Sequence, residues 1–152
     1  MAQSKFSSTL AFTISKEDQA FLRQVESGNF SIDDFNHRAH LRLAYIYLTN
    51  NDSTDSVTLV RNTLTALLEK HNIEPEAIYH ETLTHAWVQL VERAMKNSPP
   101  VSAAESFIES NPQLFDKDIL NNHYSETVLK SDAAKTSYIA PDLQPIASQP
   151  SF

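Results

Sequence analysis

The chain contains a single glycine, Gly28, among its 152 residues. Sheet proteins use glycine in hairpin turns and bulges, so its near absence argues against a β-rich fold. Asn, Ser, Asp and Pro can supply the turns between helices instead. The length suits one domain with a real hydrophobic core. We therefore predict an all-α fold, a compact single-domain bundle of four to six helices with an irregular, proline-rich C-terminal tail.

Hydrophobic periodicity and capping residues divide the chain into three parts. Residues 1–13 are expected to form a flexible or extended N-terminal arm, residues 14–140 the helical domain, and residues 141–152 the irregular tail. Ser15 and Gly28 are typical of the two ends of a first helix. The same reasoning predicts helices over residues 16–27, 32–49, 55–71, 75–97 and 102–110.

Composition excludes several functional classes. The net charge is −7, from 12 basic and 19 acidic residues, and no concentrated basic surface is visible, so we expect no nucleic-acid partner. The chain has no cysteine and therefore no disulfide, thiolate nucleophile or cysteine-bound zinc. No apolar run approaches a membrane span, and the N-terminus lacks the apolar core of a signal peptide. We expect a cytoplasmic protein that does not bind membranes.

The segment FNHRAHLRLAYIYL, residues 35–48, places two histidines at the start of an apolar helix. At about 100° per residue, His37 and His40 share a stripe with Ala44 and Leu48, so both are predicted to face inward. In the helix expected over residues 75–97, His80 leads a second apolar stripe and is also predicted to face inward. A buried imidazole must form hydrogen bonds, bind a metal or line a wet pocket.

These histidines could form a metal site between the second and fourth helices. Helical bundles build such sites from histidine pairs three residues apart and from residues of a facing helix. His37, His40 and His80 would supply three nitrogen ligands to zinc or to a non-haem iron or manganese ion, leaving a position for water or substrate. His123 is the candidate fourth ligand. The protein would then be a metal-dependent enzyme acting on a small molecule.

Two residues beside His80 are candidates for catalysis in that enzyme. Glu81 could be a partner of a histidine ligand, a fourth ligand or an acid/base, and Tyr79 could place its phenol in the same pocket. The zincin pattern H-E-x-x-H is absent, because Thr84 occupies the position of its second histidine and His85 comes one residue later.

A non-catalytic function is equally consistent with this pattern. The histidines could line a metal-free polar pocket or form hydrogen bonds within the core as structural residues. The chain would then be a helical ligand-binding or protein-interaction module. The acidic charge and the proline-rich tail would suit a protein partner.

Three blocks of sequence resemble a family of small, uncharacterised bacterial all-helical proteins. They read FxHRxHLRLAYIYL over residues 35–48, YHETLTxAW over residues 79–87, and HYSxxxLxSxxA over residues 123–134, followed by PDLQP. The resemblance implies that the blocks belong to one domain and that a pocket lies near their histidines. It carries no activity, and His71 and His85 fall outside the matched positions.

Overall fold

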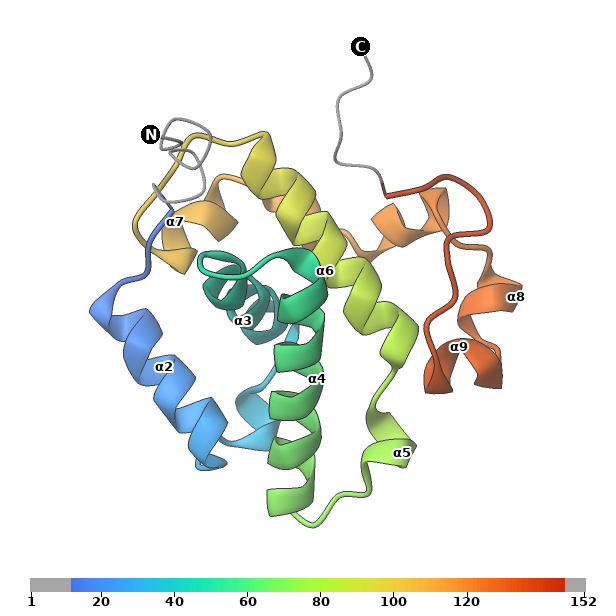
Figure 1. The fold of residues 1–152 in the computed structure, drawn as a ribbon, viewed down its shortest axis with the longest axis horizontal. Helices are drawn as coiled ribbons and strands as arrows, with labels where there is room; N and C mark the ends of the chain where they lie inside the picture. The colour runs from blue at the N-terminus through green and yellow to red at the C-terminus, as the bar shows by residue number, and fades with distance from the viewer. Residues whose placement is uncertain (1–11, 147–152) are drawn as a thin grey trace.

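The computed structural model describes residues 12–146, and within this range it contains helices and no strands. The predicted all-α fold is therefore confirmed. Four helices of twelve or more residues form the body of the molecule (Figure 1). They are α2 (Lys16–Ser27), α3 (His37–Leu48), α4 (Ser53–Lys70) and α6 (Glu81–Lys96). The shorter elements are η1 (Ile32–Asp34), α5 (Pro75–Ile78), α7 (Ala104–Glu109), η2 (Pro112–Phe115), η3 (Lys117–Asn122), α8 (Glu126–Leu129) and α9 (Asp132–Thr136).

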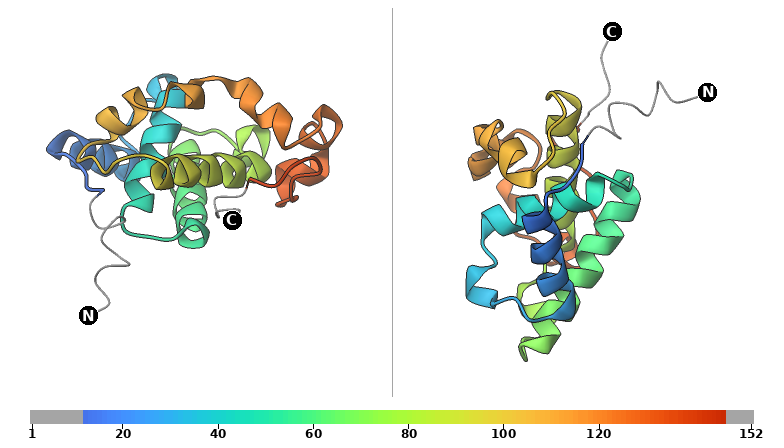
Figure 2. Two further views of the ribbon diagram at one scale, coloured as in Figure 1. Left: turned by 90° about the horizontal axis from the view of Figure 1, so that it is seen from above. Right: turned by 90° about the vertical axis from the view of Figure 1, so that its left-hand side faces the viewer.

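Helix α3 lies at the centre of the core. It contacts α2, α4, α6 and α7, and Figures 1 and 2 show it enclosed by these elements. Every residue from Leu43 to Leu48 is buried, whichever side of the helix it occupies. A helix that is apolar all round is stable only when other elements surround it, which explains the run LAYIYL. The first turn of α3 is less covered, because it lies at the edge of this core.

The ends of α2 match the residues predicted from its capping signals. Ser15 accepts a hydrogen bond from the main-chain N–H of Asp18, and the Asp18 carboxylate accepts one from the N–H of Ser15. This reciprocal pair satisfies donors that the helix itself cannot satisfy. Gly28 ends the helix with φ of 83°, a left-handed conformation that glycine adopts without steric cost.

Helices α3 and α6, which carry candidate histidines at their N-terminal ends, begin later than predicted. The segment predicted as one helix from residue 32 consists of η1 and then α3, which Asn36 caps. The helix predicted over residues 75–97 is divided into α5 and α6, because Tyr79 and His80 are extended. His80 is the N-cap of α6, a position usually occupied by Ser, Thr, Asp or Asn. The direction of the His80 side chain could therefore not be predicted from its position around the helix axis.

The last part of the described chain, from α9 onwards, packs against α6. In Figure 1, α8 and α9 lie on the opposite side of α6 from α2. The hydroxyl of Thr82 donates to the carbonyl of Ser137 and accepts from the N–H of Ile139, so α6 holds this returning segment at two main-chain atoms. Residues 141–146 are irregular, as predicted for the tail, while residues 147–152 lie outside the described residues.

The N-terminal arm is described only where it meets the body. Phe12 is buried against Tyr45, and the N–H of Thr13 donates to the carbonyl of Val101. Residues 1–11 of the predicted arm lie outside the described residues. No helix within residues 12–146 combines the length and the apolar composition needed to cross a membrane.

Candidate functional site

Both ring nitrogens of His80 are occupied by main-chain groups. Nδ1 accepts the N–H of Leu83 at 3.1 Å, and Nε2 lies 3.0 Å from the carbonyl oxygen of Leu129. This geometry assigns the proton to Nε2, which donates to Leu129. A metal ligand needs a free nitrogen lone pair, and the lone pair of Nδ1 is already used at the helix cap.

The two histidines of α3 lie in different surroundings. His37 is half-buried between Trp87 and Phe115, with ring centroids 4.5 and 6.1 Å away, and its Nε2 donates to the carbonyl of Leu114 at 2.8 Å. His40 is exposed and lies edge-on to Phe35. The prediction that His40 faces inward is therefore wrong, because its ring lies against the half-buried Phe35 near the surface instead of entering the core.

The electrostatic surroundings favour neutral imidazoles at both positions. Burial lowers the pKa of His37, and the positive charge of Lys117 adds to the effect. Although His40 is exposed as a residue, part of its ring is shielded from water. This shielding, with the nearby His37 and Lys117, lowers the pKa of His40 to about 4.

Two further histidines hold distant main-chain segments. His123 is buried, and its Nδ1 donates to the carbonyl of Gln144 at 2.8 Å. Nε2 of His71, at the end of α4, donates to the carbonyl of Gly28 at 3.1 Å. Together with His37 and His80, they form four histidine-to-carbonyl contacts that join segments 21 to 77 residues apart.

The structure does not bring the four predicted metal ligands to one point. His37 packs on Trp87, seven residues beyond His80, which corresponds to about 10 Å along a helix. His80 and His123 are each held at a different carbonyl group. Within residues 12–146, no three His, Cys, Asp or Glu side chains are grouped so that they could hold a metal ion. Metal binding remains a prediction from the sequence.

The densest polar cluster forms around Glu81, in the first turn of α6. Arg61 of α4 donates from Nε to Oε1 at 3.0 Å and from Nη2 to Oε2 at 2.7 Å. The hydroxyl of Tyr79 donates to Oε1 at 2.8 Å, and Nε2 of His85 donates to Oε2 at 2.9 Å. The two predicted catalytic residues, Tyr79 and Glu81, therefore lie together, joined by two residues that sequence reasoning had not selected.

These contacts set the charge state of the cluster. The hydrogen bonds from Arg61 lower the pKa of Glu81 to about 2, outweighing the opposing effect of burial. The same contacts raise the pKa of Arg61. Burial raises the pKa of Tyr79, so its phenol stays protonated. Glu81 is therefore an ionised acceptor that orients its three partners, rather than a proton donor at neutral pH.

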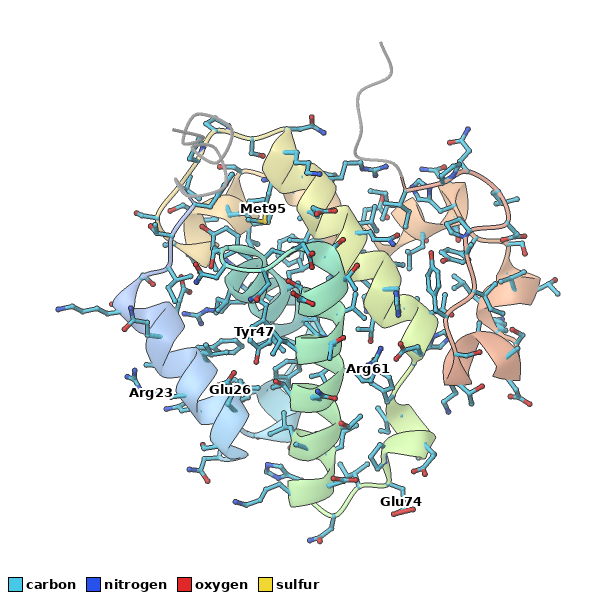
Figure 3. All side chains as sticks on the ribbon, in the orientation of Figure 1. Arg23, Glu26, Tyr47, Arg61, Glu74 and Met95 are labelled. Atoms are coloured by element: carbon cyan, nitrogen blue, oxygen red, sulfur yellow. The ribbon has the colours of Figure 1, made fainter. Side chains whose placement is uncertain are left out.

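A shallow groove of about 130 Å³ adjoins this cluster between α4 and α6. Its lining consists of Ser53, Thr54, Val57, Thr58, Arg61, His85 and Gln89. Figure 3 labels Arg61 where its side chain lies between α4 and the start of α6. The ring of Tyr138 stacks on His85, with centroids 4.2 Å apart and planes at 27°. The site therefore combines a fixed guanidinium and an oriented imidazole beside an open, hydroxyl-lined space.

The residues that sequence reasoning missed had one local signal. Glu81 and His85 are four residues apart, which places their side chains on the same side of a helix. From the sequence, His85 was considered only as a histidine one residue too late for the zincin pattern and outside the matched positions. Arg61 and Tyr138 are 20 and more than 50 residues from Glu81 along the chain, and no spacing rule connects them.

Comparison with known proteins found no matching family model, no similar curated protein and no similar solved structure. The resemblance carried by the three sequence blocks therefore stays a prediction.

Proposed function

We propose that this chain is a non-catalytic helical module that binds a small polar ligand in the groove between α4 and α6. The observation that carries the proposal is the convergence of Arg61, Tyr79 and His85 on Glu81 beside an open space. Fixing three polar side chains costs conformational entropy, and their shared carboxylate holds them in place before a ligand arrives.

Binding fits this cluster better than acid–base catalysis. A general acid or base works best with a pKa near the operating pH, whereas the pKa of Glu81 is lowered to about 2. Both carboxylate oxygens are also occupied, each by Arg61 and by one further donor. Glu81 and Tyr79, which the sequence suggested as catalytic residues, are thus better explained as residues that orient Arg61 and His85.

The histidine contacts favour the same module over the metal-dependent enzyme. His37, His80 and His123 use ring nitrogens to hold main-chain carbonyl groups of the C-terminal third against α3 and α6 or against one another. Such contacts satisfy both the imidazole and a carbonyl group in a part of the chain with only short helices. These residues act as structural connections in the proposed module.

Amide chemical shifts in two-dimensional NMR spectra test the proposal. The protein, purified without a histidine tag, is titrated separately with glycerol, acetamide, acetate, inorganic phosphate and methylguanidinium. We expect at least one probe to shift the amides of residues 53–58 and 85–89 in a saturable manner. Thr58→Trp should block the groove and abolish the shifts, whereas Ala66→Trp, on the exposed side of α4, should not. Absence of saturable groove shifts with all five probes would overturn the proposal.

Metal analysis of the same preparation distinguishes the proposed module from a metal-dependent enzyme. A metal-dependent enzyme should contain stoichiometric zinc, iron or manganese, and His40→Ala and His80→Ala should both lose it. The proposed module should show the same metal content in His40→Ala as in the unaltered protein. A stoichiometric metal that disappears in both variants would favour the enzyme over the module.

A further inference from the structure

We infer that the ligand of the α4–α6 groove is a small oxyanion, a carboxylate or a phosphate, held by the outer edge of the Arg61 guanidinium. This inference rests on the proposed function, because it names the chemical class of the ligand for the same groove. It concerns recognition only and involves no chemical step.

The hydrogen bonds to Glu81 leave part of the guanidinium available. A guanidinium has five N–H donors in a planar fork, and Glu81 accepts from Nε and from one hydrogen of Nη2. Nη1 and the second hydrogen of Nη2 lie on the other side of the fork. The Arg61 side chain is 37% exposed and lines the groove, whereas that of Glu81 is 12% exposed. Arg61 therefore faces the carboxylate with one edge and can meet a ligand with another.

The lining of the groove supplies further donors and no carboxylate. Ser53 and Thr54 present hydroxyl groups, and Gln89 presents an amide, whereas the hydroxyl of Thr58 donates to the carbonyl of Thr54 at 3.4 Å. Hydroxyl, amide and guanidinium groups are the usual donors to carboxylate and phosphate oxygens. The chain as a whole has a net charge of −7, yet no Asp or Glu side chain lines this groove.

The acidic residues near the groove are Glu81, Asp52 and Asp55. The Glu81 carboxylate is occupied by its four contacts. Asp52 caps α4 by accepting the N–H of Asp55, next to the groove residues Ser53 and Thr54. These two aspartates lower the local positive potential, so we expect the affinity to depend on direct hydrogen bonds from Arg61 more than on long-range attraction.

Three other arginines do not combine a carboxylate partner with a position beside a hydroxyl-lined groove. Arg42 is paired with the buried Asp18 and lies over the ring of Phe21, and Arg38 is paired with the exposed Glu105. Arg23 lines a second shallow hollow on α2, of about 330 Å³, but within residues 12–146 it forms no hydrogen bond or ion pair. Arg61 alone among these four is both held by a carboxylate through two bonds and placed beside a hydroxyl-lined groove.

The decisive experiment compares charged and neutral probes of similar shape. Acetate, inorganic phosphate and acetamide are titrated into the full chain, and dissociation constants are obtained from the shifts of residues 53–58 and 85–89. We expect acetate or phosphate to bind at least about tenfold more tightly than acetamide, as charge-assisted hydrogen bonds exceed neutral ones. The better of the two anions identifies a carboxylate or a phosphate ligand.

Substitutions of Arg61 and of a matched arginine test whether the anion binds in the groove between α4 and α6. Arg61→Gln should weaken anion binding about tenfold or more, while Arg23→Gln, which removes the same charge from the second hollow, should leave it unchanged. Arg61→Lys keeps the charge but loses the planar fork, so intermediate binding is expected. If Arg61→Gln fails to fold, Thr58→Trp in the otherwise unaltered chain provides the comparison, since it should block anion binding by filling the groove.

Each other outcome overturns the inference in a recognisable way. Equal losses in Arg61→Gln and Arg23→Gln would show an adventitious anion attracted by general charge. Tighter binding of acetamide, glycerol or methylguanidinium than of either anion would refute the oxyanion while leaving the binding groove intact. Failure of every probe to shift the groove residues would instead refute the proposed function.

Discussion

The guanidinium of Arg61 and the carboxylate of Glu81 form two parallel hydrogen bonds, of 3.0 and 2.7 Å, between the middle of α4 and the first turn of α6. This fork-to-fork geometry fixes both position and orientation. It connects two helices that also share part of the core, and it directs Arg61 and His85 towards one groove. The pair is therefore part of the fold and of the candidate site at the same time.

Glu81 should stabilise the protein in a pH-dependent manner. Its pKa falls from 4.5 to about 2 on folding, so its contribution is fully present above about pH 4.5 and is lost as the pH falls towards 2. The shift corresponds to about 3 kcal/mol. We expect Glu81→Gln to lower the free energy of urea unfolding by about 2–3 kcal/mol at neutral pH and by much less near pH 2.5. An equal difference at both pH values would contradict this assignment.

His80 should contribute through two separate contacts. His80→Ala loses both the cap of α6 and the hydrogen bond to Leu129, so we expect a loss of about 2 kcal/mol in unfolding free energy. His80→Asn can still cap the helix and should lose about 1 kcal/mol. His40→Ala, an exposed position, should change stability by less than about 0.5 kcal/mol. Equal effects of the Ala and Asn substitutions at His80 would show that the cap contributes nothing.

Asp18 should be among the most costly polar residues to remove. Its side chain is 1% exposed and accepts from the N–H groups of Ser15 and Ala104 and from Arg42. Although burial alone would raise the pKa of Asp18, these hydrogen bonds lower it overall. Asp18→Ala should cost about 3 kcal/mol, because the buried N–H of Ala104, the half-buried N–H of Ser15 and a guanidinium lose their acceptor.

Glu105 offers a matched comparison for Asp18. Its ion pair with Arg38 is exposed, with side chains 65% and 42% accessible. Glu105→Ala should therefore change the free energy of unfolding by less than about 0.5 kcal/mol. Chemical denaturation of the two variants gives the comparison directly, and similar losses would mean that burial does not explain the role of Asp18.

Gly28 should resist substitution for two separable reasons. Its φ of 83° disfavours any residue with a Cβ, and a Cβ there would lie 2.8 Å from Cγ of Lys70. Gly28→Ala should therefore destabilise the fold by about 1–2 kcal/mol. Adding Lys70→Ala removes the contact with Cγ but keeps Cβ of residue 70 at 3.2 Å, so at least the backbone cost of about 1 kcal/mol should remain. Complete recovery in the double variant, measured by thermal and urea unfolding, would show that the contact alone was responsible.

Much of the architecture could be predicted from local sequence signals. Ser15, Asp18 and Gly28 define α2 because a capping box and a left-handed glycine act over three or four residues. The apolar residues of α4 and the apolar second half of α3 also predicted helices at those positions, because helical periodicity is likewise visible over a few turns of sequence. The boundaries of α6 were less accessible, since His80 is an unusual N-cap and its role depends on Leu129, 49 residues away.

The sequence by itself determined that this chain forms helices, approximately where they lie, and that its histidines need polar partners. Only the tertiary structure decided which partners they have: carbonyl groups of Leu114, Leu129 and Gln144 instead of one shared point. It also brought Arg61 and Tyr138 to Glu81 and His85. The physical reason is that periodicity and capping act within a few residues, whereas hydrogen-bond partners depend on how whole helices pack.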